Sequence, residues 1–155
     1  MEEPLVRLLL MVTRLAVDEL DEGLRAAGHP DLRPAHGFVL NGIGESGATA
    51  TRLAGLLGMT KQGAAKLVES LVELGYVERE RNAGDARSTL LMLSARGREL
   101  LRRAEEIQSR LEAEWAEAIG APELGALRRG LEQVVRERHR RKRQEGELLP
   151  LRPIW

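Results

Sequence analysis

The stretch GMTKQGAAKLVESLVELGYVERE, residues 58–80, changes character halfway along its length. Its first half is small and polar, whereas the second half carries apolar residues at the spacing of one helix face: Leu67, Val68, Leu71, Val72 and Leu74. Gly58 suits the left-handed position that ends one helix, and Thr60 suits the cap that begins the next. The stretch predicts two helices joined by a turn of about three residues, the second ending at Gly75.

Helical periodicity also precedes this pair. Apolar residues spaced by three and four predict a helix over residues 4–27, and Pro34 begins a shorter one with Phe38 and Val39 inward. Thr49 suits the cap of the helix that leads into the turn. The expected inner face of that helix contains Leu53, Ala54, Leu56 and Leu57.

A hairpin and two long helices follow. The β-prone runs 76–81 and 88–93 flank the turn-rich NAGDAR and predict two paired strands. Ser94 suits the cap of a long helix, and Pro122 suits the first position of a final one. The apolar spacing of these two helices predicts an antiparallel pair with heptad-like seams.

Composition excludes several classes of protein. The chain has 155 residues, which indicates one domain, and no cysteine, which excludes disulfides, thiolate metal sites and thiol redox sensing. Lys plus Arg equals Asp plus Glu at 24 each, so any affinity for nucleic acid must come from local placement. The apolar run near the N-terminus begins with acids and is too short to span a bilayer, so we expect a cytoplasmic protein without a membrane partner.

Neither a metal site nor catalysis is indicated. His29, His36 and His139 lie in different segments without ligand spacing. We find no nucleophile with a base, no phosphate-cradling glycine loop and no placed carboxylate pair. We therefore expect no enzyme activity and no cofactor.

Two short helices followed by a hairpin form a winged helix-turn-helix, in which the N-terminal end of the second helix enters the DNA major groove. This explains the small, polar half of the opening stretch, where Gly63, Ala64 and Ala65 would allow close approach. Lys61 and Gln62 are assigned to base reading, because glutamine can pair with adenine and lysine can reach guanine acceptors. The expected DNA-binding residues are Thr49, Thr51, Thr60, Lys61, Gln62, Lys66, Arg79, Arg81, Asp85 and Arg87.

The remaining expected contacts are electrostatic. Hydroxyl groups and helix N-termini at Thr49, Thr51 and Thr60 favour phosphate. Arg87, near the hairpin tip, suits a narrow minor groove, and Asp85 is expected to hold an arginine in a productive direction. Residues 49–87 contain six basic side chains (Arg52, Lys61, Lys66, Arg79, Arg81, Arg87) against five acids (Glu69, Glu73, Glu78, Glu80, Asp85), which predicts modest, salt-sensitive nonspecific affinity.

Several weak motifs occur here in a specific order: Leu-Ala at 53–54, LVELGYVER at 71–79, DAR at 85–87 and LSARG at 93–97. In this order, residues 34–101 resemble the MarR family of transcription regulators, and the flanking helices fit that family's dimerisation helices. The resemblance implies a homodimer on a pseudo-palindromic operator in double-stranded DNA. It also implies relief by a small-molecule effector bound between the dimer helices and the DNA-binding lobe.

The expected fold class is mainly α with a small β-hairpin: a winged helix-turn-helix lobe plus N- and C-terminal dimerisation helices. We expect a single MarR-like domain over 1–155, with the lobe at 34–93, dimerisation helices at 4–27 and 94–143, and a tail at 144–155. The first and the last two helices carry more apolar surface than a small lobe can cover, which favours a homodimer independently of the resemblance.

The expected function is sequence-specific DNA binding that regulates transcription, with repression favoured over activation. An effector cavity would contain His36, Phe38 and Met11, although a chain with only four aromatic residues offers little to line an aromatic pocket. The alternative is a winged-helix protein-interaction subunit without DNA binding. A more distant alternative is a small-molecule-binding dimer without a nucleic-acid role.

Overall fold

The computed structural model describes the backbone of residues 2–144 and the side chains of 2–138 and 140. Within these residues the elements in chain order are α1 (Leu5–Ala26), α2 (Pro34–Ile43), α3 (Ala50–Leu57), α4 (Lys61–Glu73), β1 (Val77–Arg81), β2 (Thr89–Leu93), α5 (Ala95–Ile119) and α6 (Ala121–Gln144). The expected fold class, mainly helical with one hairpin, is confirmed. The expected tail, apart from residue 144, lies outside the described residues.

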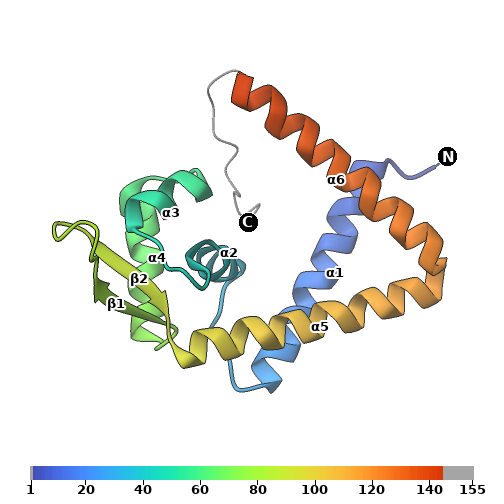
Figure 1. Cartoon of the computed structure of the whole chain (residues 1–155). Coiled ribbons are helices and arrows are strands. Elements are labelled where there is room, and N and C mark those ends of the chain that lie inside the picture. Colours follow the sequence, from blue (N-terminus) through green and yellow to red (C-terminus); the bar gives the residue numbers. More distant parts are fainter. Residues whose placement is uncertain (1, 145–155) are drawn as a thin grey trace.

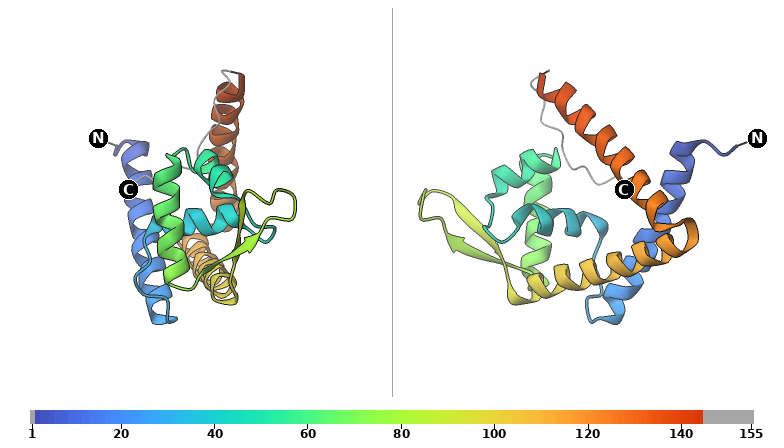
Figure 2. Two further views of the ribbon diagram at one scale, coloured as in Figure 1. Left: turned by 90° about the vertical axis from the view of Figure 1, so that its left-hand side faces the viewer. Right: turned by 45° about the vertical axis from the view of Figure 1, so that its right-hand side comes forward.

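The molecule has a lobe at one end and a helical arm at the other. Figure 1 shows α2, α3, α4 and the hairpin gathered at one end, with α5 running from the hairpin to the opposite end. There α1 packs across α5, and α6 begins where α5 ends. Figure 2 shows from two further sides that the hairpin projects away from the rest of the lobe.

The helix-turn-helix has the expected boundaries. The Thr49 hydroxyl accepts a hydrogen bond from the backbone N–H of Arg52, and Gly58 ends α3 in the left-handed region at φ 57° and ψ 38°. The Thr60 hydroxyl accepts from the N–H of Gly63 at 3.0 Å and begins α4. These caps satisfy orphan backbone donors at two helix ends and make the turn short.

The end of α4 is a Schellman motif. Gly75 has φ +79°, the N–H of Tyr76 donates to the carbonyl of Leu71 at 2.8 Å, and the N–H of Gly75 donates to Val72 at 3.0 Å. This pattern satisfies carbonyls that a helix end otherwise leaves unpaired. It also directs the chain from α4 straight into β1.

The strands pair antiparallel in a register that runs from Val77 opposite Leu93 to Arg81 opposite Thr89. Ala48 adds one bridge on the other side of β2, exchanging both backbone hydrogen bonds with Leu91 at 2.9 and 3.0 Å. The sequence did not indicate this bridge. It fixes the start of α3 against the hairpin.

The core of the lobe contains most of the expected inward residues. Val39, Leu53, Leu71 and other residues of α2–α4 are almost fully buried, joined by Leu91 and Leu93 of β2 and Leu100 of α5. Two assignments were wrong. Leu56 is 38% exposed because it falls on the outer side of α3, and Ala64 is fully buried, so its small size serves helix packing and not approach to a ligand.

Tyr76 forms a buried junction at which three elements of the chain meet. Its side chain is 0% exposed, and its hydroxyl lies 3.1 Å from Nδ1 of His29 and 3.2 Å from Nη2 of Arg96. The guanidinium of Arg96 also stacks over the Tyr76 ring, 4.7 Å from its centroid. One side chain therefore links the end of α1, the end of α4 and the start of α5.

Backbone contacts tighten the same junction. The N–H of Ser94 donates to the carbonyl of Tyr76 at 3.0 Å, and the Ser94 hydroxyl donates to the carbonyl of Gly75 at 2.6 Å while accepting from the N–H of Gly97. Gly97 packs so closely here that a Cβ would collide with the carbonyl oxygen of Tyr76. The first turn of α5 therefore requires glycine at this position.

Two histidines are buried and neutral. Burial lowers the pKa of His29, an effect that Arg96 and Arg103 reinforce and Glu99 opposes. Burial also lowers the pKa of His36, with a smaller contribution from Arg33. A neutral His29 can accept at Nδ1 from the Tyr76 hydroxyl, which in turn accepts from Arg96, whereas Nε2 of His29 is buried without a hydrogen-bond partner among the described residues.

The predicted pairing of the last two helices was wrong. Figure 1 shows α6 turning away from α5 beyond Gly120, whose φ of +98° sets the change in direction. The side chains expected to face α5 are largely exposed: Leu127 44%, Leu131 36%, Val134 67% and Val135 52%. Helix α6 also starts one residue earlier than expected, so Pro122 occupies its second position.

Helix α1 likewise leaves half of its predicted stripe exposed. Leu24 is buried, and Gly23 allows α1 to approach Ile107 of α5 closely. Further toward the N-terminus, Leu5, Leu8, Val12 and Leu15 are between 41% and 64% exposed. Periodicity located these helices correctly, but it did not reveal that one chain leaves the apolar faces of α1 and α6 open.

We predict that Gly97→Ala destabilises the protein by about 1–3 kcal/mol, since overpacking a rigid backbone contact costs that much. Gly55→Ala, in the interior of α3 with open space around a new Cβ, should be neutral or stabilising by up to about 1 kcal/mol. Urea unfolding of both variants tests this. Equal stability of the two would contradict the tight contact at Tyr76.

Candidate nucleic-acid interface

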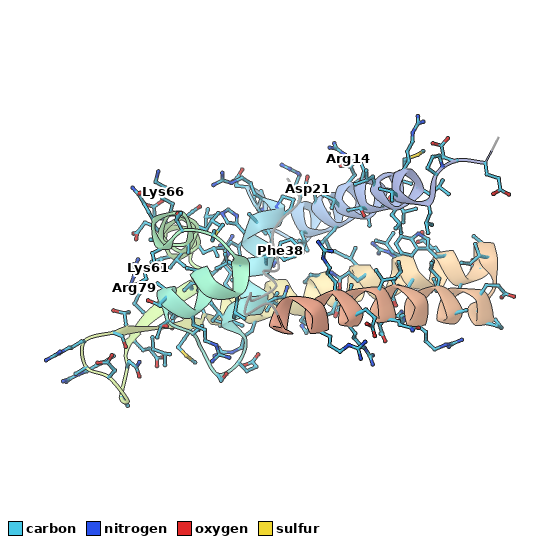
Figure 3. All side chains as sticks on the ribbon, turned by 90° about the horizontal axis from the view of Figure 1, so that it is seen from above. Arg14, Asp21, Phe38, Lys61, Lys66 and Arg79 are labelled. Carbon is cyan, nitrogen blue, oxygen red and sulfur yellow. The ribbon has the colours of Figure 1, made fainter. Side chains whose placement is uncertain are left out.

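The N-terminal tip of α4 is exposed. Thr60, Lys61, Gln62 and Lys66 all have exposed side chains, whereas Val68 and Leu71 further along the helix are buried. Figure 3 shows Lys61 and Lys66 at the end of the molecule remote from Arg14 of α1. Helix α4 is thus anchored by its second half and presents its first turn to solvent.

Three hydroxyl groups lie at the N-termini of α3 and α4. Thr49 and Thr60 each accept a backbone hydrogen bond as caps, which leaves their hydroxyl hydrogens available to donate. Thr51 is exposed in the first turn of α3. Hydroxyl donors beside unpaired backbone N–H groups and the positive end of a helix dipole are well suited to bind phosphate.

The alternation of β1 separates its charges. Residues paired across the hairpin share a face, and Arg79 and Arg81 lie opposite Leu91 and Thr89 on the face turned toward the helices. Glu78 and Glu80, opposite Met92 and Leu90, lie on the other face. Basic and acidic side chains are therefore nearly equal in number in this segment, but β1 has one cationic face and one acidic face.

The hairpin tip is an ordered polar turn. The Asp85 carboxylate accepts from the backbone N–H of Arg87 at 3.0 Å, and the Asp85 carbonyl accepts from the N–H of Ser88 at 3.0 Å. Asn82 also bridges the turn, donating to the Ser88 hydroxyl at 2.7 Å. Asp85 was expected to orient an arginine side chain, but its carboxylate binds the backbone of Arg87.

A groove of about 380 Å³ separates α4 from the hairpin. Thr49 and Thr51 line it at the N-terminus of α3, Ala65 and Glu69 on α4, and Arg79 and Arg87 on the hairpin. The structure thus brings four of the expected residues, Thr49, Thr51, Arg79 and Arg87, into one concave surface. The tip residues Thr60, Lys61 and Gln62, with Lys66, belong to the adjoining exposed end of α4 and do not line the groove.

Most cations around this groove are available to a ligand. In the described part of the chain, Arg52, Lys61, Lys66, Arg81 and Arg87 form no ion pair. Arg79 is the exception: its Nη2 lies 2.5 Å from Oε2 of Glu69 on α4. The role of Glu69 was missed because the contact crosses from a helix to a strand, and no sequence spacing marks it.

The three expected effector residues have different surroundings. His36 is buried, and its Nδ1 accepts from the backbone N–H of Arg33 at the start of α2. Phe38 is half-buried against the core, and Met11 of α1 is 54% exposed. The burial of His36 is thus explained by helix capping, although its Nε2 is buried without a hydrogen-bond partner.

The described residues contain neither a metal cluster nor a membrane-spanning helix. No group of three or more His, Asp or Glu side chains among them could hold a metal ion. No helix within residues 2–144 is long and apolar enough to cross a membrane.

An exposed helix tip, a preceding short helix and a flanking cationic hairpin define the class of this protein as a winged helix-turn-helix. Residues 31–88 match the family model MarR_2, described as the MarR family. A comparison with curated proteins gives no match.

Solved structures extend the likeness over most of the chain. Wild-type apo MarR from E. coli is 26% identical, with 86% of this chain and 98% of that chain covered and a TM-score of 0.67. The transcriptional regulator Tm0710 from Thermotoga maritima (24% identity, 88% and 96% covered, TM-score 0.61) has the same fold. So has a point mutant of S. aureus MepR bound to an oligodeoxyribonucleotide (19% identity, 88% and 99% covered, TM-score 0.61).

The winged helix-turn-helix lobe of this chain therefore matches the MarR family in sequence and in fold, and the resemblance inferred from its motifs is confirmed. This assignment supports DNA-binding transcription regulation as the class of function.

We predict that Asp85→Ala loosens the hairpin tip and that Asp85→Asn does not, because asparagine keeps an oxygen that can accept from the N–H of Arg87. One hydrogen bond is worth about 1 kcal/mol net, so trypsin cleavage after Arg87 should rise roughly fivefold in the alanine variant. Both variants remove the same charge. Equal cleavage rates in the two would show that the carboxylate does not order the turn.

Proposed function

We propose that this protein is a sequence-specific DNA-binding transcription regulator that acts as a homodimer, probing the major groove with α4 and the flanking minor groove with the hairpin. The observation that carries the proposal is the exposed tip of α4 next to a groove lined by Thr49, Thr51, Arg79 and Arg87. A repressor role follows if binding at an operator blocks transcription.

The chemistry of the exposed side chains assigns them to base contacts or to phosphate contacts. Gln62 and Lys61 in the first turn of α4 are the base readers, since their side chains are exposed and can reach major-groove acceptors and donors. Thr49, Thr51, Thr60 and Lys66 fix the register on phosphates, which carry no sequence information. Arg81 and Arg87 contact the backbone and minor groove from the hairpin, while Asp85 orders its tip.

The homologous fold supports a DNA ligand. MepR, whose fold this chain shares, is seen bound to an oligodeoxyribonucleotide. In this chain Arg81 on the helix-facing side of β1 and Arg87 at the hairpin tip give the hairpin a local positive charge, despite zero net charge overall.

The open apolar faces of α1 and α6 support a homodimer. Leu15 of α1 is 64% exposed and Val134 of α6 is 67% exposed, and both belong to larger exposed apolar sets on their helices. Contiguous apolar surface of this kind marks an interaction site in a soluble protein. In a two-fold dimer the two α4 helices would lie about 34 Å apart, one turn of DNA.

A small-molecule effector is part of the proposal because the family resemblance implies one. Met11 of α1 is exposed in the isolated chain, so a cavity that it shares with His36 and Phe38 of α2 would need a partner chain to cover it. Ligand screening by thermal shift, carried out on the assembled dimer, would test this part of the proposal.

We predict that Gln62→Ala weakens binding to the preferred operator by about 1–3 kcal/mol, the value of one good base contact, and leaves random duplex binding nearly unchanged. Thr49→Ala should weaken both alike, because its contact is to phosphate. The operator is first selected from genomic fragments, and affinities are then measured against salt concentration. If Gln62→Ala lost the same affinity for the operator and for random duplex DNA, Gln62 would not be a base reader. If the DNA affinity of the wild type did not change with salt concentration, the alternative, a protein-interaction subunit, would be favoured.

We predict that Leu15→Asp with Val134→Asp converts the dimer to a folded monomer, because both side chains are exposed in the isolated chain. Leu56→Asp, an exposed apolar position in the lobe, is the matched control and should stay dimeric. Sedimentation velocity and circular dichroism measure assembly and folding separately. Buried positions such as Leu111, 7% exposed, are unsuitable because their loss would unfold the chain.

A further inference from the structure

The ion pair between Glu69 and Arg79 crosses the groove. Oε2 of Glu69 on α4 lies 2.5 Å from Nη2 of Arg79 on β1, and the side chains are 56% and 43% exposed. Most other ion pairs of the described residues join positions three or four apart along the chain. This pair instead connects two elements that both face the proposed DNA ligand.

The location of Glu69 is unfavourable for binding an anion. It lines the same groove as Thr51 and Arg87, and its carboxylate would repel a phosphate placed there. Figure 3 shows Arg79 and Lys61 at the same end of the molecule, where the lobe lies. Arg81, two residues along the same face of β1, has no such partner among the described residues. Glu69 thus neutralises one selected cation of the hairpin.

We propose that Glu69 is a specificity-determining residue, which holds Arg79 away from DNA phosphates and so keeps sequence-independent attraction low. The proposal rests on the function proposed above. A phosphate contact strengthens binding to every sequence equally, whereas a base contact strengthens binding to the operator alone. By removing one phosphate contact, Glu69 raises the share of the affinity that depends on Gln62 and Lys61.

The test is Glu69→Gln, which keeps the size of the side chain and removes its charge. Freed Arg79 gains about one phosphate contact, so the slope of log affinity against log salt for random duplex DNA becomes steeper by about 0.9. Affinity for random duplex rises at low salt, and this gain shrinks roughly 3.5-fold when the salt concentration is raised fourfold. The ratio of operator to random affinity falls.

Two controls isolate the ion pair. Glu80→Gln removes the same charge from the neighbouring position of β1, but Glu80 lies on the opposite face of the hairpin, so the slope should stay at the wild-type value. In the double variant Glu69→Gln with Arg79→Gln, no arginine is freed and the steeper slope should disappear. Circular dichroism melting checks that each variant is folded.

The outcomes are distinct. A steeper slope in Glu69→Gln alone supports the inference. An unchanged or shallower slope in Glu69→Gln overturns the inference and leaves the proposed function intact. An equally steeper slope in Glu80→Gln has the same consequence. If the wild type itself binds random duplex without any dependence on salt, the proposed function fails and this inference fails with it.

Discussion

The lobe depends on the buried junction at Tyr76. The tyrosine follows the Schellman end of α4, precedes β1, and bonds through its hydroxyl to His29 and Arg96. Ser94 and Gly97 bring the first turn of α5 against its backbone. The directions of α4, the hairpin and α5 are therefore set at one point. Helix α4, which carries the exposed tip, and α5, which begins the arm, are both connected to this junction.

The second organising feature is the separation of charge by the hairpin. A strand alternates its side chains between two faces, so the order Glu78, Arg79, Glu80, Arg81 places both cations on one side and both acids on the other. The bridge between Ala48 and Leu91 then brings the N-terminus of α3 to the cationic side. A chain with no net charge can in this way present a locally positive groove, and the strength of attraction is adjusted within it by Glu69.

The arm presents the opposite situation, because its apolar residues have no partner within the chain. Gly120 sends α6 away from α5, and α1 packs on α5 most tightly near Gly23 and Leu24. The faces left open lie on α1 and α6 of the arm, whereas the tip proposed for DNA lies on α4 of the lobe (Figure 1). This arrangement separates the surface proposed for assembly from the surface proposed for DNA.

The sequence by itself determined the elements and the exposed tip of α4, because caps and stops such as Thr60 and Gly75 act through groups within one helical turn. The tertiary structure alone decided what the elements face. Ala64 proved to be core, α6 to diverge from α5, and Glu69 to pair with Arg79 across the groove. Periodicity shows that a helix has an apolar face, but not whether its own chain or another molecule covers that face. Contacts between elements depend on how helices and hairpin pack, and that information is distributed over the whole core.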